Sequence, residues 1–175
     1  MAIQKFGPDN ASLTVRTARQ GAAAKAGHDL LIEVGAWDAT LDLDGQPALT
    51  LNADSRSLLV LEGTGGIKAL TDDDRADIAK TINEEVLKGC AIEFRSSEVQ
   101  RTPGGLAVRG ELTLRGKRSP ATFELAIGDD GHLTGSTTVT QTQFGMKPYR
   151  ALFGALKLAD EVQVAIDGRL DQSSL

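Results

Sequence analysis

Hydrophobic and polar residues alternate in short runs along most of this chain. The clearest case is residues 106–127, where two alternating runs flank the basic segment 116–120. Side chains of a β-strand point alternately to opposite faces, so each run predicts a strand with one apolar and one polar face. Because Pro120 lacks the backbone donor that a central strand needs, we expect segment 116–120 to be a long turn between two antiparallel strands.

One run is unusually long and changes phase at a glycine. Its apolar positions are even-numbered from Leu30 to Val34 and odd-numbered from Trp37 to Leu43, with Gly35 in between. A phase change of this kind predicts a β-bulge or a sharp bend, which is how barrels turn corners. Shorter alternating runs predict further strands at residues 12–18, 49–52, 57–62, 90–101, 132–141 and 160–170.

A single segment has the pattern of an α-helix. Thr71 can cap the first turn, with Asp74 at the reciprocal capping-box position, and the acidic run 72–74 suits the positive end of the helix dipole. This run lacks the spaced ligands and the glycine of a calcium loop, so we expect no metal site there. We predict one helix at about residues 72–88, whose apolar stripe consists of Ile78, Ile82 and Val86.

These elements predict a mainly β protein with a single domain over residues 1–175. About eight strands follow one another at meander spacing, and no alternation of strands and helices supports a parallel sheet. Both a sandwich and a barrel fit such a chain, and the long run bent at Gly35 favours the barrel. We therefore expect a single antiparallel up-and-down β-barrel of about eight strands, with one inserted helix. A barrel of about this size is either filled by its own side chains or holds one slender ligand.

Composition narrows the possible partners and compartment. The formal net charge of -5 and an aromatic content of 4% argue against nucleic acid as a partner. Cys90 is the only cysteine, so no intrachain disulfide can form. The sequence as given shows neither a signal-peptide pattern nor a run long enough to span a bilayer, so we expect a cytoplasmic protein. The local basic cluster at 115–118 is either a solvated turn or a contact for anionic lipid.

Three short motifs resemble those of a known family. Residues 110–122 read Gly-x-Leu-Thr-x-x-Gly-x-x-x-Pro-x-Thr, residues 143–146 read Gln-Phe-Gly-Met and are followed by Asp-Glu-Val at 160–162, and Gly-His-Asp stands at 27–29. In order and spacing the chain is similar to the YceI-like family of polyisoprenoid- or lipid-binding proteins. The resemblance implies a lipocalin-like barrel with the helix against it and a long apolar chain in the lumen. Arg115 stands where the family often has His, and many members are exported.

The expected site is the inward face of the barrel. Apolar walls with a few polar groups are what a lipid tail requires. Alternatively, these side chains fill the barrel themselves, and the pattern does not separate the two possibilities. The inward set comprises Leu13, Val15, Leu30, Ile32, Val34, Trp37, Leu41, Leu59, Leu61, Ile92, Phe94, Leu112, Leu114, Phe123, Leu125, Val162, Val164 and Ile166.

Two polar or aromatic features flank this face. His28 is either a head-group contact at the barrel mouth or a hydrogen-bonded loop histidine. The loop with Phe144, Tyr149, Arg150 and Phe153 is either a lid, with Arg150 near an anionic head group, or a segment packed on the barrel end. The sequence has no nucleophile-elbow motif and no obvious carboxylate pair, so no residue is assigned as catalytic and no metal ligand is expected.

Three functions follow, in order of preference. The first is non-catalytic binding, carriage or sequestration of a long-chain amphipathic lipid, polyisoprenoid or fatty-acid-like, with no other cofactor. The second is an enzyme acting on an apolar substrate, with His28, Tyr149 or Arg150 supplying polar groups. The third is a ligand-free structural barrel that works through protein contacts, for example as a homodimer.

Overall fold

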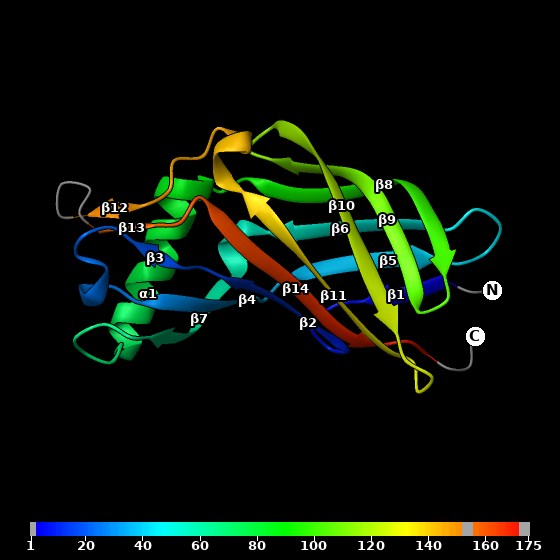
Figure 1. Ribbon diagram of the computed structural model, residues 1–175, viewed down its shortest axis with the longest axis horizontal. Helices are drawn as coiled ribbons and strands as arrows, with labels where there is room; N and C mark the ends of the chain where they lie inside the picture. Colours follow the sequence, from blue (N-terminus) through cyan, green and yellow to red (C-terminus); the bar gives the residue numbers. More distant parts are fainter. Residues whose placement is uncertain (1–2, 152–155, 172–175) are drawn as a thin grey trace.

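The structure is a computed structural model and describes residues 3–151 and 156–171. An eleven-stranded antiparallel sheet curls round on itself, and a second sheet of three short strands lies at one end of it (Figure 1). In chain order the strands are β1 (Ile3–Phe6), β2 (Ala11–Arg16), β3 (Arg19–Gln20), β4 (Asp29–Val34), β5 (Trp37–Asp42), β6 (Ala48–Asp54), β7 (Leu58–Thr64), β8 (Ala91–Thr102), β9 (Gly105–Leu114), β10 (Lys117–Ile127), β11 (His132–Thr140), β12 (Arg150–Ala151), β13 (Leu156–Leu158) and β14 (Glu161–Arg169).

The chain crosses the large sheet eight times although the sheet contains eleven strands. Three of these crossings, here called paths, are interrupted and so count as two strands each. The order of the strands in the sheet is β1-β5-β6-β8-β9-β10-β11-β14-β2-β4-β7, and β1–β2, β4–β5 and β6–β7 are each two successive halves of one path. Strand β5 pairs with β1 and β6, while β4 pairs with β2 and β7, so the path from Asp29 to Asp42 joins the two ends of the sheet. The predicted antiparallel up-and-down barrel is confirmed, and its strand count is higher because three paths are interrupted.

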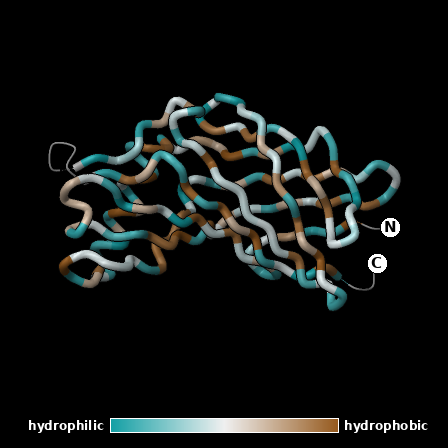
Figure 2. Tube along the Cα trace, in the orientation of Figure 1, coloured by the Kyte–Doolittle hydropathy of each residue, from teal (hydrophilic) through white to brown (hydrophobic). Residues whose placement is uncertain are grey.

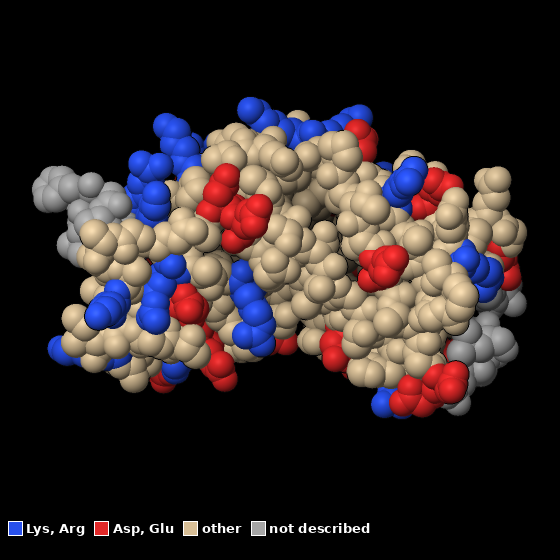
Figure 3. Space-filling view, in the orientation of Figure 1, with Lys and Arg blue, Asp and Glu red and all other residues tan. Residues whose placement is uncertain are grey.

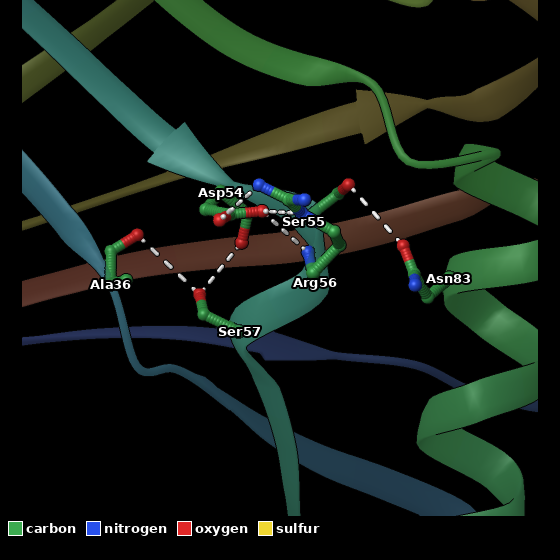
Figure 4. Close-up of polar contacts among 6 residues, drawn as sticks. All are labelled: Ala36, Asp54, Ser55, Arg56, Ser57 and Asn83. Atoms are coloured by element: carbon green, nitrogen blue, oxygen red, sulfur yellow. Dashed lines mark hydrogen bonds and ion pairs between the residues drawn. The ribbon is translucent and has the colours of Figure 1, made fainter.

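The bend predicted at Gly35 is present. Val34 and Trp37 are both buried, as the change of phase required. Gly35 N donates to Ser57 O at 2.9 Å, and a Cβ on Gly35 would stand 2.9 Å from the same oxygen, so only glycine fits without a shift. Figure 4 shows the neighbouring bend between β6 and β7, where Ser57 Oγ donates to Asp54 O at 2.6 Å. The two bends lie side by side and turn both strands together.

The connection between β9 and β10 corrects the predicted long turn at 116–120. Arg115 and Gly116, with φ of 51° and 73°, form a two-residue turn of the type I′ class, and β10 begins at Lys117. Pro120 lies inside β10, opposite Glu111. It is tolerated because this part of β10 pairs only with β9, since β11 pairs only with residues 125–127. The prediction assumed that any strand through Pro120 would be a central one, paired on both sides.

The helix α1 (Asp72–Thr81) confirms the predicted one and its cap. Asp74 N donates to Thr71 Oγ1 at 3.1 Å, and Thr71 N donates to Asp74 Oδ2 at 2.9 Å, which completes a capping box. The helix continues as a π-helical turn, η3 (Ile82–Leu87), before Lys88 and Gly89 end it in left-handed conformations. No residue of α1 is buried, whereas Val86 and Leu87 of η3 are. The last turn therefore buries its side chains against the barrel, while α1 packs along β7 with partly exposed side chains.

One end of the barrel is filled by its own side chains. Val99, Leu106 and Val108 are at most 7% exposed. They come from strand segments near the end of the barrel where the two chain termini lie (Figure 1). Hydrophobic and hydrophilic residues alternate along these strands in the hydropathy-coloured trace (Figure 2). At this end the side-chain-filled interior expected as one alternative is what the structure shows.

Candidate functional site

The other half of the barrel encloses a cavity of about 240 Å³. This volume exceeds the roughly 150 Å³ of an engineered cavity that binds benzene, and lies just below the roughly 300–1,000 Å³ of pockets for drug-sized ligands. It therefore suits a slender apolar group or one section of a longer chain. Its wall is almost wholly apolar and includes residues outside the predicted inward set, among them Phe6, Leu49, Leu51, Leu58, Val86, Leu87, Leu133, Val139, Met146 and Leu158.

Most of the predicted inward residues stand on this wall. Their side chains come from strands throughout the sheet, as expected for a barrel in which alternate residues of every strand point inward. Whether they contact a ligand stays a prediction. The predicted residues on the wall are Leu13, Val15, Ile32, Val34, Leu41, Ile92, Phe94, Leu112, Leu114, Phe123, Leu125, Tyr149, Val162, Val164 and Ile166.

Two predicted wall residues point the opposite way. Leu59 and Leu61 are 54% and 44% exposed on the outer face of β7, whereas Leu58 and Val60 are buried. Residues 58–61 are all apolar, so the sequence pattern does not show which of these side chains point into the barrel. The pairing of Val60 with Ile32 decides it, because directly opposed residues of antiparallel strands share a face.

Three predicted residues are buried but do not reach the cavity. Leu30, Trp37 and Phe144 are 6%, 7% and 3% exposed and belong to the packed core. Trp37 Nε1 has no hydrogen-bond partner among the described residues. These side chains support the cavity wall without forming it. The prediction included them because the sequence pattern indicates burial but does not distinguish the filled end of the barrel from the hollow one.

The polar candidates lie away from the cavity. His28 Nε2 stands 2.6 Å from Lys68 O, and the His28 ring lies against Gly66. His28 is therefore the hydrogen-bonded loop histidine of the second alternative, and it fixes the loop at residues 65–68. Arg150 is exposed on β12, directly opposite Lys157 of β13. Phe153 lies outside the described residues. Of the described residues of the predicted loop, Met146 and Tyr149 reach the cavity wall.

The sequence analysis missed the polar wall residues, of which Thr17 and Gln141 are buried and Ser136 and Thr137 are not. Gln141 is 6% exposed and donates from Nε2 to Ala159 O at 3.1 Å, and Thr17 is 9% exposed and accepts at Oγ1 from Leu30 N at 3.3 Å. Each lies one residue beyond the end of a strand, at the next position in the alternating series of inward-pointing residues. This position in the series is the signal that could have identified them. The Gln141 carbonyl and the Thr17 hydroxyl are polar groups that the wall can offer to a ligand.

The cavity opens sideways between β10 and β11. These strands pair only through residues 125–127 and 133–135, so residues 117–124 of β10 have no partner on this side. Inward residues beside the gap, such as Phe123 and Thr137, are only partly buried. Figure 1 shows β10 and β11 diverging, and the space-filling view of the same face is hollowed there (Figure 3).

Short helical segments close the cavity at its ends. Ile82, Val86 and Leu87 of η3 cover one part, and this turn approaches the β6–β7 bend, where Ser55 Oγ donates to Asn83 Oδ1 at 3.5 Å (Figure 4). On the other side η4 (Gln141–Phe144) is joined to β10 by a 3.3 Å bond from Ser119 Oγ to Gln143 Oε1. The cavity thus lies between the curled sheet, the helix end and η4.

Ionisable groups lie outside the cavity wall. Tyr149 is the one wall residue among those described whose side chain ionises. The carboxyls with clearly altered pKa lie on the surface: the Arg56 side chain lowers the pKa of Asp54, and the His132 backbone N–H lowers that of Asp130. Within residues 3–151 and 156–171, no three His, Cys, Asp or Glu side chains gather in a metal-binding arrangement. In the same part of the chain, no helix has the length and apolar character to cross a membrane.

Several solved structures share this fold at low sequence identity. BcnA of Burkholderia cenocepacia is 15% identical, with a TM-score of 0.64, 90% of this chain and 94% of that chain covered. A polyisoprenoid binding domain from Saccharophagus degradans is 8% identical, with a TM-score of 0.57 and coverage of 97% and 99%. The YCEI protein of Campylobacter jejuni is 11% identical, with a TM-score of 0.55 and coverage of 81% and 85%.

The sequence itself supplies the assignment. No curated protein sequence matches the chain. The model of the YceI-like domain, however, matches residues 32–170, which include the cavity-forming strands β5 to β11, the helix and β14. The motifs at 110–122 and 143–146, from which the resemblance was inferred, fall within this range and form the β9–β10 hairpin and the η4 segment. The chain therefore belongs to the family of YceI-like domains.

Proposed function

We propose that this protein binds a slender, largely apolar molecule in the barrel cavity and carries or sequesters it without changing it chemically. The observation that supports this most directly is the cavity of about 240 Å³ with an almost wholly apolar wall. Burying a methylene group contributes about 0.8 kcal/mol, so a chain of several methylene or isoprene carbons gains enough to bind.

The volume limits how much of a ligand can be inside. A long polyisoprenoid or fatty-acid-like chain needs more room than this cavity offers, so part of it must extend through the opening between β10 and β11. The polar groups of Thr17 and Gln141 suit a hydroxyl, carbonyl or carboxylic acid group on such a ligand. The ligand class that fits best is therefore an amphipathic lipid with one unbranched or isoprenoid tail.

The comparison with a known binder supports the same class. The Saccharophagus degradans structure with the same fold is described as a polyisoprenoid binding domain. Its identity to this chain is 8%, so it supports the class of ligand through the shared fold and not through matched residues. The volume and wall of the cavity, which belong to this chain, carry the main weight.

The two alternative functions have less support. An enzyme needs a titratable or nucleophilic group against its substrate, and the described wall offers only Tyr149 and a few hydroxyl and amide groups. A purely structural barrel needs no hollow interior, yet this barrel encloses a cavity of about 240 Å³. Binding without catalysis accounts for both observations.

Mass spectrometry provides the test. Purified protein is analysed by native mass spectrometry, and its organic extract is analysed for lipids. We expect one apolar molecule per chain, or uptake of one equivalent of farnesol or palmitate after delipidation. A protein that carries no lipid and takes up neither compound contradicts the proposal.

A further inference from the structure

Six basic side chains lie within four residues of cavity-wall residues in sequence, in a chain whose net charge is negative. The chain has 19 Lys and Arg residues against 24 Asp and Glu, so a basic cluster is not expected by chance of composition. The cluster comes from the β9–β10 turn, from the segment after η4 and from the small sheet. We call it the basic rim, and it consists of Arg115, Lys117, Arg118, Lys147, Arg150 and Lys157.

Direct contacts hold one part of the rim together. Arg115 Nη1 donates to Gly145 O at 3.2 Å. A Cβ on Gly145 would stand 2.8 Å from Lys117 Nζ, so the Lys117 side chain lies across this glycine. The β9–β10 turn and the segment that leads to Lys147 therefore form one basic surface, although about thirty residues separate them in sequence.

The small sheet adds a pair of like charges. Arg150 of β12 and Lys157 of β13 are directly opposite each other in the strand register. Like charges in this position destabilise a sheet. None of the six rim residues makes an ion pair with a carboxylate among the described residues, so their charges are not neutralised by direct pairing.

Acidic groups near the rim are fewer than its six cations: besides Asp160 and Glu161 they include Glu111, opposite Pro120, and Glu93, opposite the Thr113 that pairs with Arg118. Both oxygens of Asp160 accept from Thr142, at 2.8 Å from its backbone N and 2.6 Å from its hydroxyl. Glu161 is exposed at the start of β14. The larger acidic run, 72–74, belongs to the start of α1, where it serves the helix cap. The rim therefore keeps a net positive charge that an external anion can neutralise.

Two parts of the rim lie next to the gap between β10 and β11 or to the cavity wall. Lys117 and Arg118 begin the stretch of β10 that has no partner on the β11 side. Tyr149, between Lys147 and Arg150 in sequence, is 42% exposed and also stands on the cavity wall. In Figure 3 Lys and Arg side chains lie along the upper edge and over the end that carries β12 and β13, where Asp and Glu side chains lie among them.

We propose that the basic rim docks on an anionic bilayer, with the cavity opening toward the lipid. Each Lys or Arg close to an anionic membrane surface strengthens binding by about fivefold, so six of them suffice for reversible attachment. Tyr149 is suited to this place because tyrosine favours the boundary between water and lipid. The negative charge of the remaining surface orients the molecule with the rim toward the membrane. A lipid then passes between bilayer and cavity without crossing water, a consequence that rests on the proposed function.

Vesicle sedimentation tests the docking with the full chain. Binding is measured to vesicles of phosphatidylcholine alone and to vesicles of equal parts phosphatidylcholine and phosphatidylglycerol. We expect attachment only to the anionic vesicles, and its loss at high salt because screening weakens charge attraction. Equal binding to both vesicle types, or to neither, overturns the proposal.

Matched charge reversals distinguish the rim from overall charge. The double variant Arg150→Glu with Lys157→Glu should weaken binding to anionic vesicles by more than about tenfold. The control, Lys5→Glu with Lys80→Glu, makes the same change in net charge at exposed positions outside the rim and should bind as the unchanged protein does. An equal loss in both variants overturns the proposal. Lipid uptake by mass spectrometry is measured in parallel, so a failure of docking is separable from a failure of ligand binding.

Discussion

Leu125 occupies the space that a side chain at Gly135 would need. A Cβ on Gly135 would stand 2.5 Å from Leu125 Cδ2 and 3.0 Å from Glu124 O. These two residues are also the register pair at which pairing between β10 and β11 ends. The absence of a side chain at Gly135 thus lets the two strands close over Leu125, and the opening of the cavity begins immediately beyond this pair.

Gly135→Ala should destabilise the protein by about 1–3 kcal/mol, the usual cost of overpacking. The added methyl group meets Leu125, so the cost should shrink when Leu125→Ala is present in the same chain. The free energy of unfolding in urea, measured for both single variants and the double variant, gives the coupling. An equal cost of Gly135→Ala in both backgrounds would contradict the packing argument.

Val164→Trp should abolish binding of an apolar ligand while the fold is kept. Val164 is partly buried on the cavity wall, and a larger side chain there projects into the empty volume. Leu59→Trp is the matched control, because Leu59 is 54% exposed on the outer face. Titration with a fluorescent fatty acid should show at least about tenfold weaker binding for Val164→Trp, since each buried methylene contributes about 0.8 kcal/mol. Equal affinities in the two variants would place the ligand elsewhere.

Trp37→Phe should cost little stability, in contrast to Trp37→Ala. The indole N–H is buried without a partner among the described residues, and an unsatisfied buried donor costs about 1–3 kcal/mol. Removing it offsets part of the lost packing, whereas Trp→Ala in a core usually costs about 3–5 kcal/mol. Trp37 is the only tryptophan, so unfolding should be followed by circular dichroism. A cost for Trp37→Phe near that of Trp37→Ala would show that the N–H has a partner.

Thr71→Ala should lower stability by about 1 kcal/mol at neutral pH through loss of the helix cap. The reciprocal bond from Thr71 N lowers the pKa of Asp74 below its ordinary value of 3.8. A lowered carboxyl pKa contributes stability that is complete above 3.8 and disappears as the pH falls through the folded-state value. The midpoint temperature of thermal unfolding should therefore be lower for Asp74→Ala than for the unchanged protein at neutral pH. This difference should shrink toward low pH. A difference independent of pH would exclude the charged capping bond.

Local patterns in the sequence determined much of the fold. Alternation predicted the strands, the capping residues Thr71 and Asp74 predicted the helix, and the phase change at Gly35 predicted the bend. These features depend on residues within a few positions of one another, which is why the sequence reveals them. The same alternation predicted which residues of most strands point inward, and these residues form the majority of the cavity wall.

Tertiary structure alone decided the orientation of residues 58–61, the place of Pro120 inside a strand and the division of the barrel into a filled and a hollow half. Each depends on which strands pair and for how long: Val60 faces inward because it pairs with Ile32, and Pro120 is tolerated because β11 has already diverged. Pairing between strands distant in the chain is a property of the whole sheet, so no local pattern encodes the cavity or its opening.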